Sequence, residues 1–75
     1  AQDGLAIGLG YLAAALVTGM AAIGAGIAVA AAAPAAIGAF SEDPKSFGKS
    51  LIFVALGEGV AIYGLLISIL ILNKL

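Results

Sequence analysis

Glu58 is the residue of this sequence whose type and surroundings could do chemistry. It is the one acidic or basic residue in the predominantly apolar stretch over residues 51–72. Its neighbours at helical spacing are all apolar, namely Val54, Ala55, Ala61 and Ile62. A charged carboxyl group in the middle of a bilayer costs ~2.5–3.5 kcal/mol on insertion scales, so such a residue is functional by default. Apolar surroundings also disfavour the ionised form, and we expect Glu58 to be neutral in lipid and to carry a proton.

Four residues near Glu58 are candidates for lining its site: Gly57, Gly59, Ile62 and Tyr63. The two glycines flank the carboxyl group and remove bulk where a partner or a neighbouring helix comes close, or they simply let helices pack. Ile62 lies one helical turn further on. Tyr63 lies about 140° around the helix from Glu58, so its hydroxyl is better placed for the glutamate of a neighbouring copy than for its own.

The ion favoured by these residues is H⁺ rather than Na⁺. A Na⁺ site needs several oxygen ligands, and folding the chain back at Pro44 brings Glu58 level with residues 28–30. Residues 19–40 contain no Ser, Thr, Asn or Gln, and Thr18 lies about ten residues too deep. The next polar side chain after Glu58 is Tyr63, so backbone carbonyls alone could supplement the carboxylate. We expect no bound metal and no cofactor.

Several other functions are excluded by composition. The chain has no His, no Cys and a net charge of −1, which removes nucleic-acid binding, thiolate or histidine metal sites and disulfides. It has no phosphate loop and no nucleophile arrangement, so we expect neither catalysis nor nucleotide binding. Residues 8–13 fit the pattern G-x-G-x-x-A, but they follow no strand and lie in an apolar helix, where they pack helices.

The elements that carry Glu58 are predicted to be membrane helices. Hydrophobic residues make up 64% of the chain and charged residues 9%, against about 45–50% and about 25% in soluble domains. Residues 4–40 contain no charge and exceed the ~20 residues that cross a bilayer, so they predict one long helix, which Pro34 bends near its end. Residues 41–46 predict a polar loop and residues 47–73 a second spanning helix. The fold class is therefore all-α, a single membrane hairpin over residues 1–75.

The first helix is rich in glycine and alanine, whereas the second is mostly Leu, Ile and Val and is expected to face lipid. Small residues four positions apart let helices approach closely, and they occupy more than one side of the first helix. The residues that we expect to pack neighbouring helices are Gly24, Gly26, Ala28 and Ala30. Several small sides require several neighbours, which predicts a homo-oligomer closed into a ring; a compact dimer of hairpins is the alternative.

Positive charge predicts the orientation of the hairpin. Lys45 and Lys49 flank the loop, whereas Lys74 alone marks the other end, so the loop is expected in the cytoplasm. The sequence begins with Ala1 rather than Met, which suggests that a signal peptide or another leader segment has been removed.

The sequence resembles the proteolipid (c or K) subunits of rotary ATPases over essentially its whole length. Residues 56–65, LGEGVAIYGL, are similar to the E-x-x-A-I-Y-G-L stretch of the vacuolar and archaeal-type branch. The loop sequence Glu42-Asp43-Pro44, followed by Phe47-Gly48, also resembles that branch and departs from the Arg-(Gln/Asn)-Pro loop of the F-type branch. A prokaryotic A/V-type enzyme is therefore favoured over an F-type enzyme.

The resemblance implies a ring in which first helices lie inside and second helices face the lipid. Glu58 would carry H⁺ and meet a stator subunit with an essential arginine, so that ion flow turns the ring. Loop residues Glu42, Asp43 and Pro44 would contact a central-stalk subunit, and ATP chemistry would take place elsewhere in the complex. The expected location is a prokaryotic plasma membrane.

Two other functions compete with this interpretation. A small proton-coupled exporter also uses a lone membrane glutamate, but such proteins usually have four spans with the glutamate in the first. A purely structural membrane hairpin would explain the small residues and leave Glu58 without a purpose. Replacing Glu58 by Gln separates the two: a structural hairpin should still support function, whereas a rotor subunit should assemble and fail to translocate ions.

Overall fold

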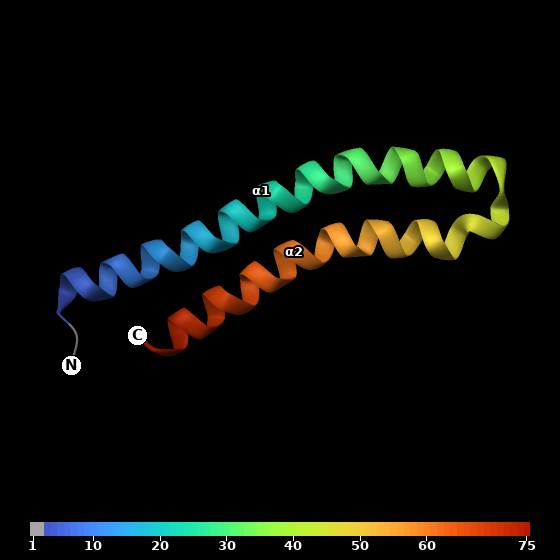
Figure 1. The fold of residues 1–75 in the computed structure, drawn as a ribbon. Coiled ribbons are helices and arrows are strands. Elements are labelled where there is room, and N and C mark those ends of the chain that lie inside the picture. Colours follow the sequence, from blue (N-terminus) through green and yellow to red (C-terminus); the bar gives the residue numbers. More distant parts are fainter. Residues whose placement is uncertain (1–2) are drawn as a thin grey trace.

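The computed structural model describes residues 3–75, which form a hairpin of two antiparallel helices (Figure 1). Helix α1 spans Gly4–Glu42, a short 3₁₀ helix η1 spans Pro44–Ser46, and helix α2 spans Phe47–Asn73. The start of α1 and the end of α2 lie at one end of the hairpin, and the connecting turn lies at the other (Figure 1). The predicted all-α hairpin is thus confirmed. Ala1, on which the expectation of a removed leader rests, lies outside the described residues.

Local hydrogen bonds set the ends of the helices. The Asp3 carboxylate accepts from the backbone N–H of Ala6 at 2.7 Å and caps the start of α1. At the other end, the Ser41 hydroxyl donates to the carbonyl of Ile37 at 2.8 Å, and the helix continues through Glu42. Asp43 then adopts an extended backbone (φ −136°, ψ 97°), as expected of a residue before proline.

The turn is consequently shorter than the loop predicted over residues 41–46. Ser41 and Glu42 belong to α1, and Pro44–Ser46 form η1, which leads directly into α2. The Asp43 carboxylate accepts from the backbone N–H of Lys45 at 3.1 Å and so caps η1. A polar side chain that bonds to its own backbone can extend or start a helix, which composition alone does not reveal.

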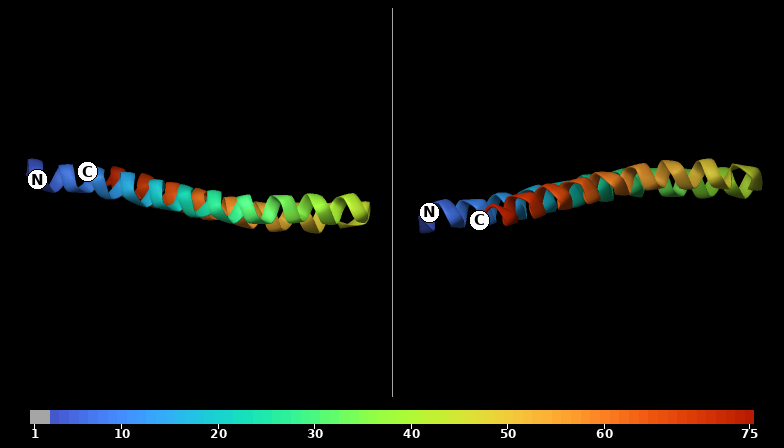
Figure 2. Two further views of the ribbon diagram at one scale, coloured as in Figure 1. Left: turned by 90° about the horizontal axis from the view of Figure 1, so that it is seen from above. Right: turned by 90° about the horizontal axis from the view of Figure 1, so that it is seen from below.

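The hairpin is a single layer of two helices. Its extents are 59 × 17 × 7 Å, and the views from above and below show α1 and α2 overlapping, with the first turns of α1 extending beyond α2 (Figure 2). Both helices curve in the same direction (Figure 1). Helix α1 contains Pro34, whereas α2 contains no proline and curves alongside α1. Because a bilayer core is ~30 Å thick, a hairpin of this length extends beyond the hydrocarbon.

The two helices meet along one line of contact, which we call the seam. The α2 residues on the seam are buried or half-buried and recur every three or four positions: Ser50, Val54, Gly57, Ala61, Gly64, Ser68 and Ile71. This alternation is the spacing of a coiled-coil contact. On α1 the deepest residues are Ala14 and Ala25, which are 5% and 3% exposed. Both helices therefore contribute small residues to the seam, and α2 keeps most of its large side chains outside.

Both helices are long and apolar enough to cross a membrane. The best 18-residue window of each has a mean hydropathy of 2.1. Large hydrophobic side chains are exposed all along the hairpin, because a two-helix layer has no interior beyond the seam. Lipid or further protein must cover this surface.

Candidate functional site

Glu58 lies about half-way along α2 and is exposed on the hairpin surface. The preceding residue, Gly57, faces α1, and successive helical residues lie 100° apart, so Glu58 points to one side of the seam. None of the side-chain hydrogen bonds within residues 3–75 involves its carboxyl group. The hairpin thus presents a carboxyl group on one of its two broad faces, open to lipid or to another protein.

The close approach of the helices beside Glu58 depends on Gly57. A Cβ atom at this position would lie 3.1 Å from Val29 Cγ2 and 3.5 Å from Ala28 Cβ. Gly57 therefore serves the packing of α2 on α1. The contact also confirms the register expected from folding the chain at Pro44, since it puts Glu58 level with residues 28–30.

The other three residues near Glu58 point away from α1. A Cβ atom on Gly59 would meet nothing within 4 Å, and Ile62 and Tyr63 are 66% and 67% exposed. Ile62 lies one turn from Glu58, whereas Tyr63 lies on another side of the helix. A single hairpin therefore supplies one carboxyl group with apolar neighbours and leaves the surroundings of Glu58 open.

The part of α1 level with Glu58 has no side-chain oxygen, because residues 19–40 contain no polar side chain. The Thr18 hydroxyl contacts that of Ser68, ten residues beyond Glu58 along α2. The part of the chain that the structure describes contains no group of three or more His, Cys, Asp or Glu residues that could hold a metal ion.

Of the residues expected to pack neighbouring helices, only Ala28 lies against α2, where it meets Gly57. Gly24, Gly26 and Ala30 are exposed, and a Cβ atom at either glycine would meet nothing within 4 Å. These small residues thus remain available on the outside of the hairpin.

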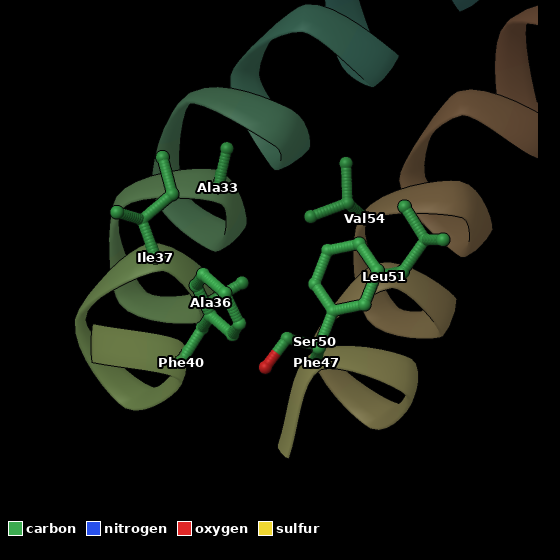
Figure 3. A pocket seen from close by; sticks show the side chains of 8 residues that line it. All are labelled: Ala33, Ala36, Ile37, Phe40, Phe47, Ser50, Leu51 and Val54. Carbon is green, nitrogen blue, oxygen red and sulfur yellow. The ribbon is translucent and has the colours of Figure 1, made fainter. Parts of the chain in front are cut away.

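An apolar groove lies between the helices near the turn, on the broad face that carries Glu58 (Figure 3). Its volume is about 230 Å³, and its lining residues are Ala33, Ala36, Ile37, Phe40, Phe47, Ser50, Leu51 and Val54. Leu51 precedes Glu58 by seven residues, two helical turns, which puts both side chains on the same side of α2. The rings of Phe40 and Phe47 contact each other, with centroids 5.1 Å apart, and close the groove towards the turn.

A second groove lies on the opposite broad face at the same end. It shares Ala36 and Ser50 with the first, and its other lining residues are Ala32, Ala35, Ala39, Ser46, Lys49 and Phe53. Most residues of the second groove come one position before a residue of the first groove, as Ala32 does before Ala33. Consecutive residues point 100° apart around a helix, so the two sets face different directions. The two broad faces of the hairpin are therefore different surfaces.

The residues expected to contact a central stalk lie at the tip of the hairpin. Glu42 ends α1, Asp43 is extended and Pro44 begins η1, and all three are exposed. The tip therefore offers two acidic side chains to a partner.

Sequence reasoning missed the contribution of α2 to the seam, including Gly64 and the hydroxyl pair of Ser68 and Thr18. The signal was present, because Ser50, Gly57 and Gly64 recur every seven residues within a helix otherwise rich in Leu and Ile. Such a heptad of small residues predicts a narrow contact line.

This hairpin with its single mid-span carboxyl group matches a known family. Residues 12–71 match the ATP synthase C-subunit family. The chain belongs to this family and is therefore an integral membrane protein, a proteolipid subunit of the rotary ATPase type. The match includes Glu58, the seam on both helices and the turn.

Comparison with individual relatives places the chain nearer to the A-type branch. It is 52% identical over 69 residues to the A-type ATP synthase subunit K of Sulfolobus acidocaldarius and 49% identical over 69 residues to that of Methanocaldococcus jannaschii. Each match covers 92% of this chain, which spans 63% of the first relative and 26% of the second. The ATP synthase c-type subunit of Synechococcus elongatus is 38% identical, with 95% of this chain and 93% of the relative covered. The chain is thus A-type-like, as its residues 56–65 predict.

Proposed function

We propose that this chain is an ion-carrying subunit of the rotor ring of an A/V-type rotary ATP synthase or ATPase, and that Glu58 carries the ion. The observation that supports this most strongly is the position of Glu58, a carboxyl group exposed at mid-span on an apolar hairpin of the ATP synthase C-subunit family. Glu58 has no cation beside it in the hairpin, so its charge must be met by a proton or by another protein.

The carried ion in this proposal is H⁺. In lipid, apolar surroundings keep Glu58 protonated and neutral, so the ring can turn without moving a bare charge through the hydrocarbon. Beside an arginine of a stator subunit, the nearby positive charge favours the ionised form, and the proton leaves. The position of Thr18, on Ser68 and away from Glu58, supports H⁺ over Na⁺ because it leaves Glu58 without side-chain oxygen ligands from α1.

The two different broad faces of the hairpin support a ring. Gly26 precedes Ala33 of the first groove by seven residues, so it lies on the Glu58 face. Ala28 precedes Ala35 of the second groove by seven, so it lies on the opposite face. A contact between one face and the other, repeated from copy to copy, is heterologous and closes into a ring, whereas a dimer pairs identical surfaces.

The remaining parts of the proposal are supported by the exposed tip, the lysines beside it and the A-type-like relatives. The tip with Glu42, Asp43 and Pro44 contacts the central stalk on the cytoplasmic side of a prokaryotic plasma membrane. The protein itself catalyses no reaction and binds no nucleotide. One charge crossing 100 mV releases about 2.3 kcal/mol, so several carriers must act for each ATP, which a ring of identical copies provides.

The proposal is tested by replacing Glu58 in the complete complex, reconstituted into vesicles. We expect Glu58→Gln to assemble and to abolish ATP-driven proton uptake, because an amide cannot release a proton. Glu58→Asp keeps an ionisable group and is expected to retain part of the activity. Asp3→Asn is the matched control at the end of the hairpin away from the tip; it keeps the oxygen that caps α1, and we expect it to pump. Proton uptake by an assembled Glu58→Gln complex would overturn the proposal.

A further inference from the structure

A pair of hydroxyl groups lies inside the seam, on the side of Glu58 away from the turn. The Ser68 hydroxyl, in a residue only 5% exposed, donates to the backbone carbonyl of Ala14 at 2.5 Å. The Thr18 hydroxyl contacts the oxygen of Ser68. A hydroxyl has one hydrogen, and that of Ser68 is used on Ala14, so Thr18 donates to Ser68. The result is a short chain of hydrogen bonds from α1 to α2 and back.

This chain of hydrogen bonds differs in kind from the rest of the seam. All side-chain hydrogen bonds between α1 and α2 within residues 3–75 involve Ser68. Elsewhere the seam consists mainly of Ala, Gly, Val and Ile, whose apolar contacts lack the direction of a hydrogen bond. A shift would separate Ser68 from Ala14 and Thr18, and lipid supplies no water to replace these interhelical hydrogen bonds.

We propose that Ser68 and Thr18 form a polar lock that fixes the register and rotation of α2 on α1, and thereby the direction in which Glu58 points. A single polar group in an apolar helix contact is an established way of fixing register. The turn at Asp43 and Pro44 fixes the two helices at one end of the seam. The polar lock fixes them on the other side of Glu58, away from the turn. Ser68 and Thr18 are thus positioning residues.

The consequence for Glu58 rests on the function proposed above, whereas the lock itself does not. If α2 slips by one turn, Gly57 moves away from Val29 and Glu58 changes its depth by about 5.4 Å. A ring that presents each carboxyl group to one stator site requires every copy to have the same register. The lock provides that uniformity inside each hairpin.

Disulfide cross-linking can read the register directly, because the sequence contains no cysteine. Ala28→Cys with Gly57→Cys reports the native register, since a Cβ atom on Gly57 would lie 3.5 Å from Ala28 Cβ, within the range of a disulfide. Ala28→Cys with Ala61→Cys reports a shift of about one turn. The two pairs are compared in the assembled full-length protein, in an otherwise native sequence and in the lock variants.

The lock variants are Ser68→Ala and Thr18→Val, the latter being nearly isosteric. Their controls are Thr18→Ser, which keeps the hydroxyl, and Ser50→Ala, which removes a hydroxyl from a buried seam residue outside the lock. We expect each lock variant to raise the ratio of shifted to native cross-link about threefold, equivalent to the ~0.6 kcal/mol that an interhelical hydrogen bond contributes on average in a membrane. The controls are expected to leave the ratio unchanged.

An unchanged ratio in Ser68→Ala and Thr18→Val, or an equal rise in Ser50→Ala, would overturn the lock. The pH profile of carbodiimide modification at Glu58 is measured in the same variants, without the cysteines. We expect the profile to change in Ser68→Ala and Thr18→Val and to return to the native profile in Thr18→Ser. A shifted register with an unchanged Glu58 profile would overturn the positioning role. If Glu58 fails to react in the native protein, the proposed function fails, and the cross-linking ratio still decides the lock.

Discussion

Gly57 of α2 lies against Val29 of α1 so closely that a methyl group on Gly57 would come within 3.1 Å of Val29 Cγ2. This contact is adjacent in sequence to Glu58, the carboxyl group exposed on the broad face of the hairpin. The backbone of α2 is therefore held against α1 beside the residue that we propose to carry the ion. The position of Glu58 thus depends on Gly57, which has no side chain and lets α2 pack closely against α1.

The two glycines beside Glu58 are expected to respond differently to alanine. Gly59→Ala places its methyl group in open space in the hairpin and gains the helix propensity of alanine, about 1 kcal/mol. Gly57→Ala gains the same propensity but must displace Val29, which offsets the gain. We expect Gly59→Ala to be the more stable variant of the isolated hairpin in detergent, measured by sodium dodecyl sulfate titration. Equal stability would show that the Gly57 contact is loose.

Gly64 lies where α2 packs tightly against α1. A Cβ atom on Gly64 would collide with Ala21 Cβ and lie 3.2 Å from the carbonyl oxygen of Val17. Because backbone surrounds this site, we expect Gly64→Ala to separate the helices and to cost about 1–3 kcal/mol in the free energy of unfolding. Adding Ala21→Gly removes the opposing methyl group, and we expect it to restore part of the loss.

Gly10→Ala is the matched control for Gly64→Ala. A Cβ atom on Gly10 would lie 2.6 Å from Leu75 Cδ2, which is the far end of a flexible side chain. Leu75 can move aside, so we expect only a small change in the free energy of unfolding. A loss at Gly10 as large as at Gly64 would contradict the view that backbone proximity causes the effect.

Asp43 is expected to stabilise the turn through its carboxylate oxygen. The side chain accepts from the N–H of Lys45 at 3.1 Å, so Asp43→Ala loses a cap worth about 0.5–2 kcal/mol in the free energy of unfolding. Asp43→Asn keeps an acceptor in the same place and is expected to lose less. Glu42→Ala makes a useful comparison, because no hydrogen bond within residues 3–75 involves the Glu42 side chain. A similar loss in Glu42→Ala would assign the effect to charge at the tip.

Sodium ions are expected to leave the chemistry of Glu58 unchanged. Thr18 bonds to Ser68 rather than pointing to Glu58, and Ile62, one turn away, has no oxygen in its side chain. We therefore expect carbodiimide modification of Glu58 to proceed at the same rate with and without Na⁺ at constant ionic strength, with K⁺ as the matched salt. If Na⁺ but not K⁺ slowed the modification of Glu58, the carried ion would be Na⁺ rather than H⁺, and Glu58 would still be the carrier.

Much of the fold follows from patterns that the sequence displays openly. A charge-free run over residues 4–40 and an apolar run over residues 47–73 define two spans, because few other structures bury so much apolar surface. Pro44 fixes the turn, and counting residues from it predicts that Glu58 lies level with residues 28–30. Glu58 itself is recognisable because a lone carboxyl group in such a helix is costly.

The details that were missed depend on side chains with more than one possible hydrogen-bond partner. Ser41 bonds to the carbonyl of Ile37 and prolongs α1, whereas composition assigns it to the loop. Ser68 bonds to Ala14 on the other helix, although a serine can equally bond within its own helix. The choice between these partners depends on which side of each helix faces the other, and only the packed hairpin defines it.

The most direct test of the proposed function is carbodiimide modification of the native assembly in detergent, with the modified residues located by mass spectrometry across a range of pH. Carbodiimides react with protonated carboxyl groups, so a neutral Glu58 in apolar surroundings is expected to react preferentially, and its modification is expected to fall as the pH rises. Glu42 and Asp43, exposed at the tip, serve as internal references for ordinary carboxylates. Modification of Glu58 no greater than that of Glu42 and Asp43 would contradict its role as the proton carrier.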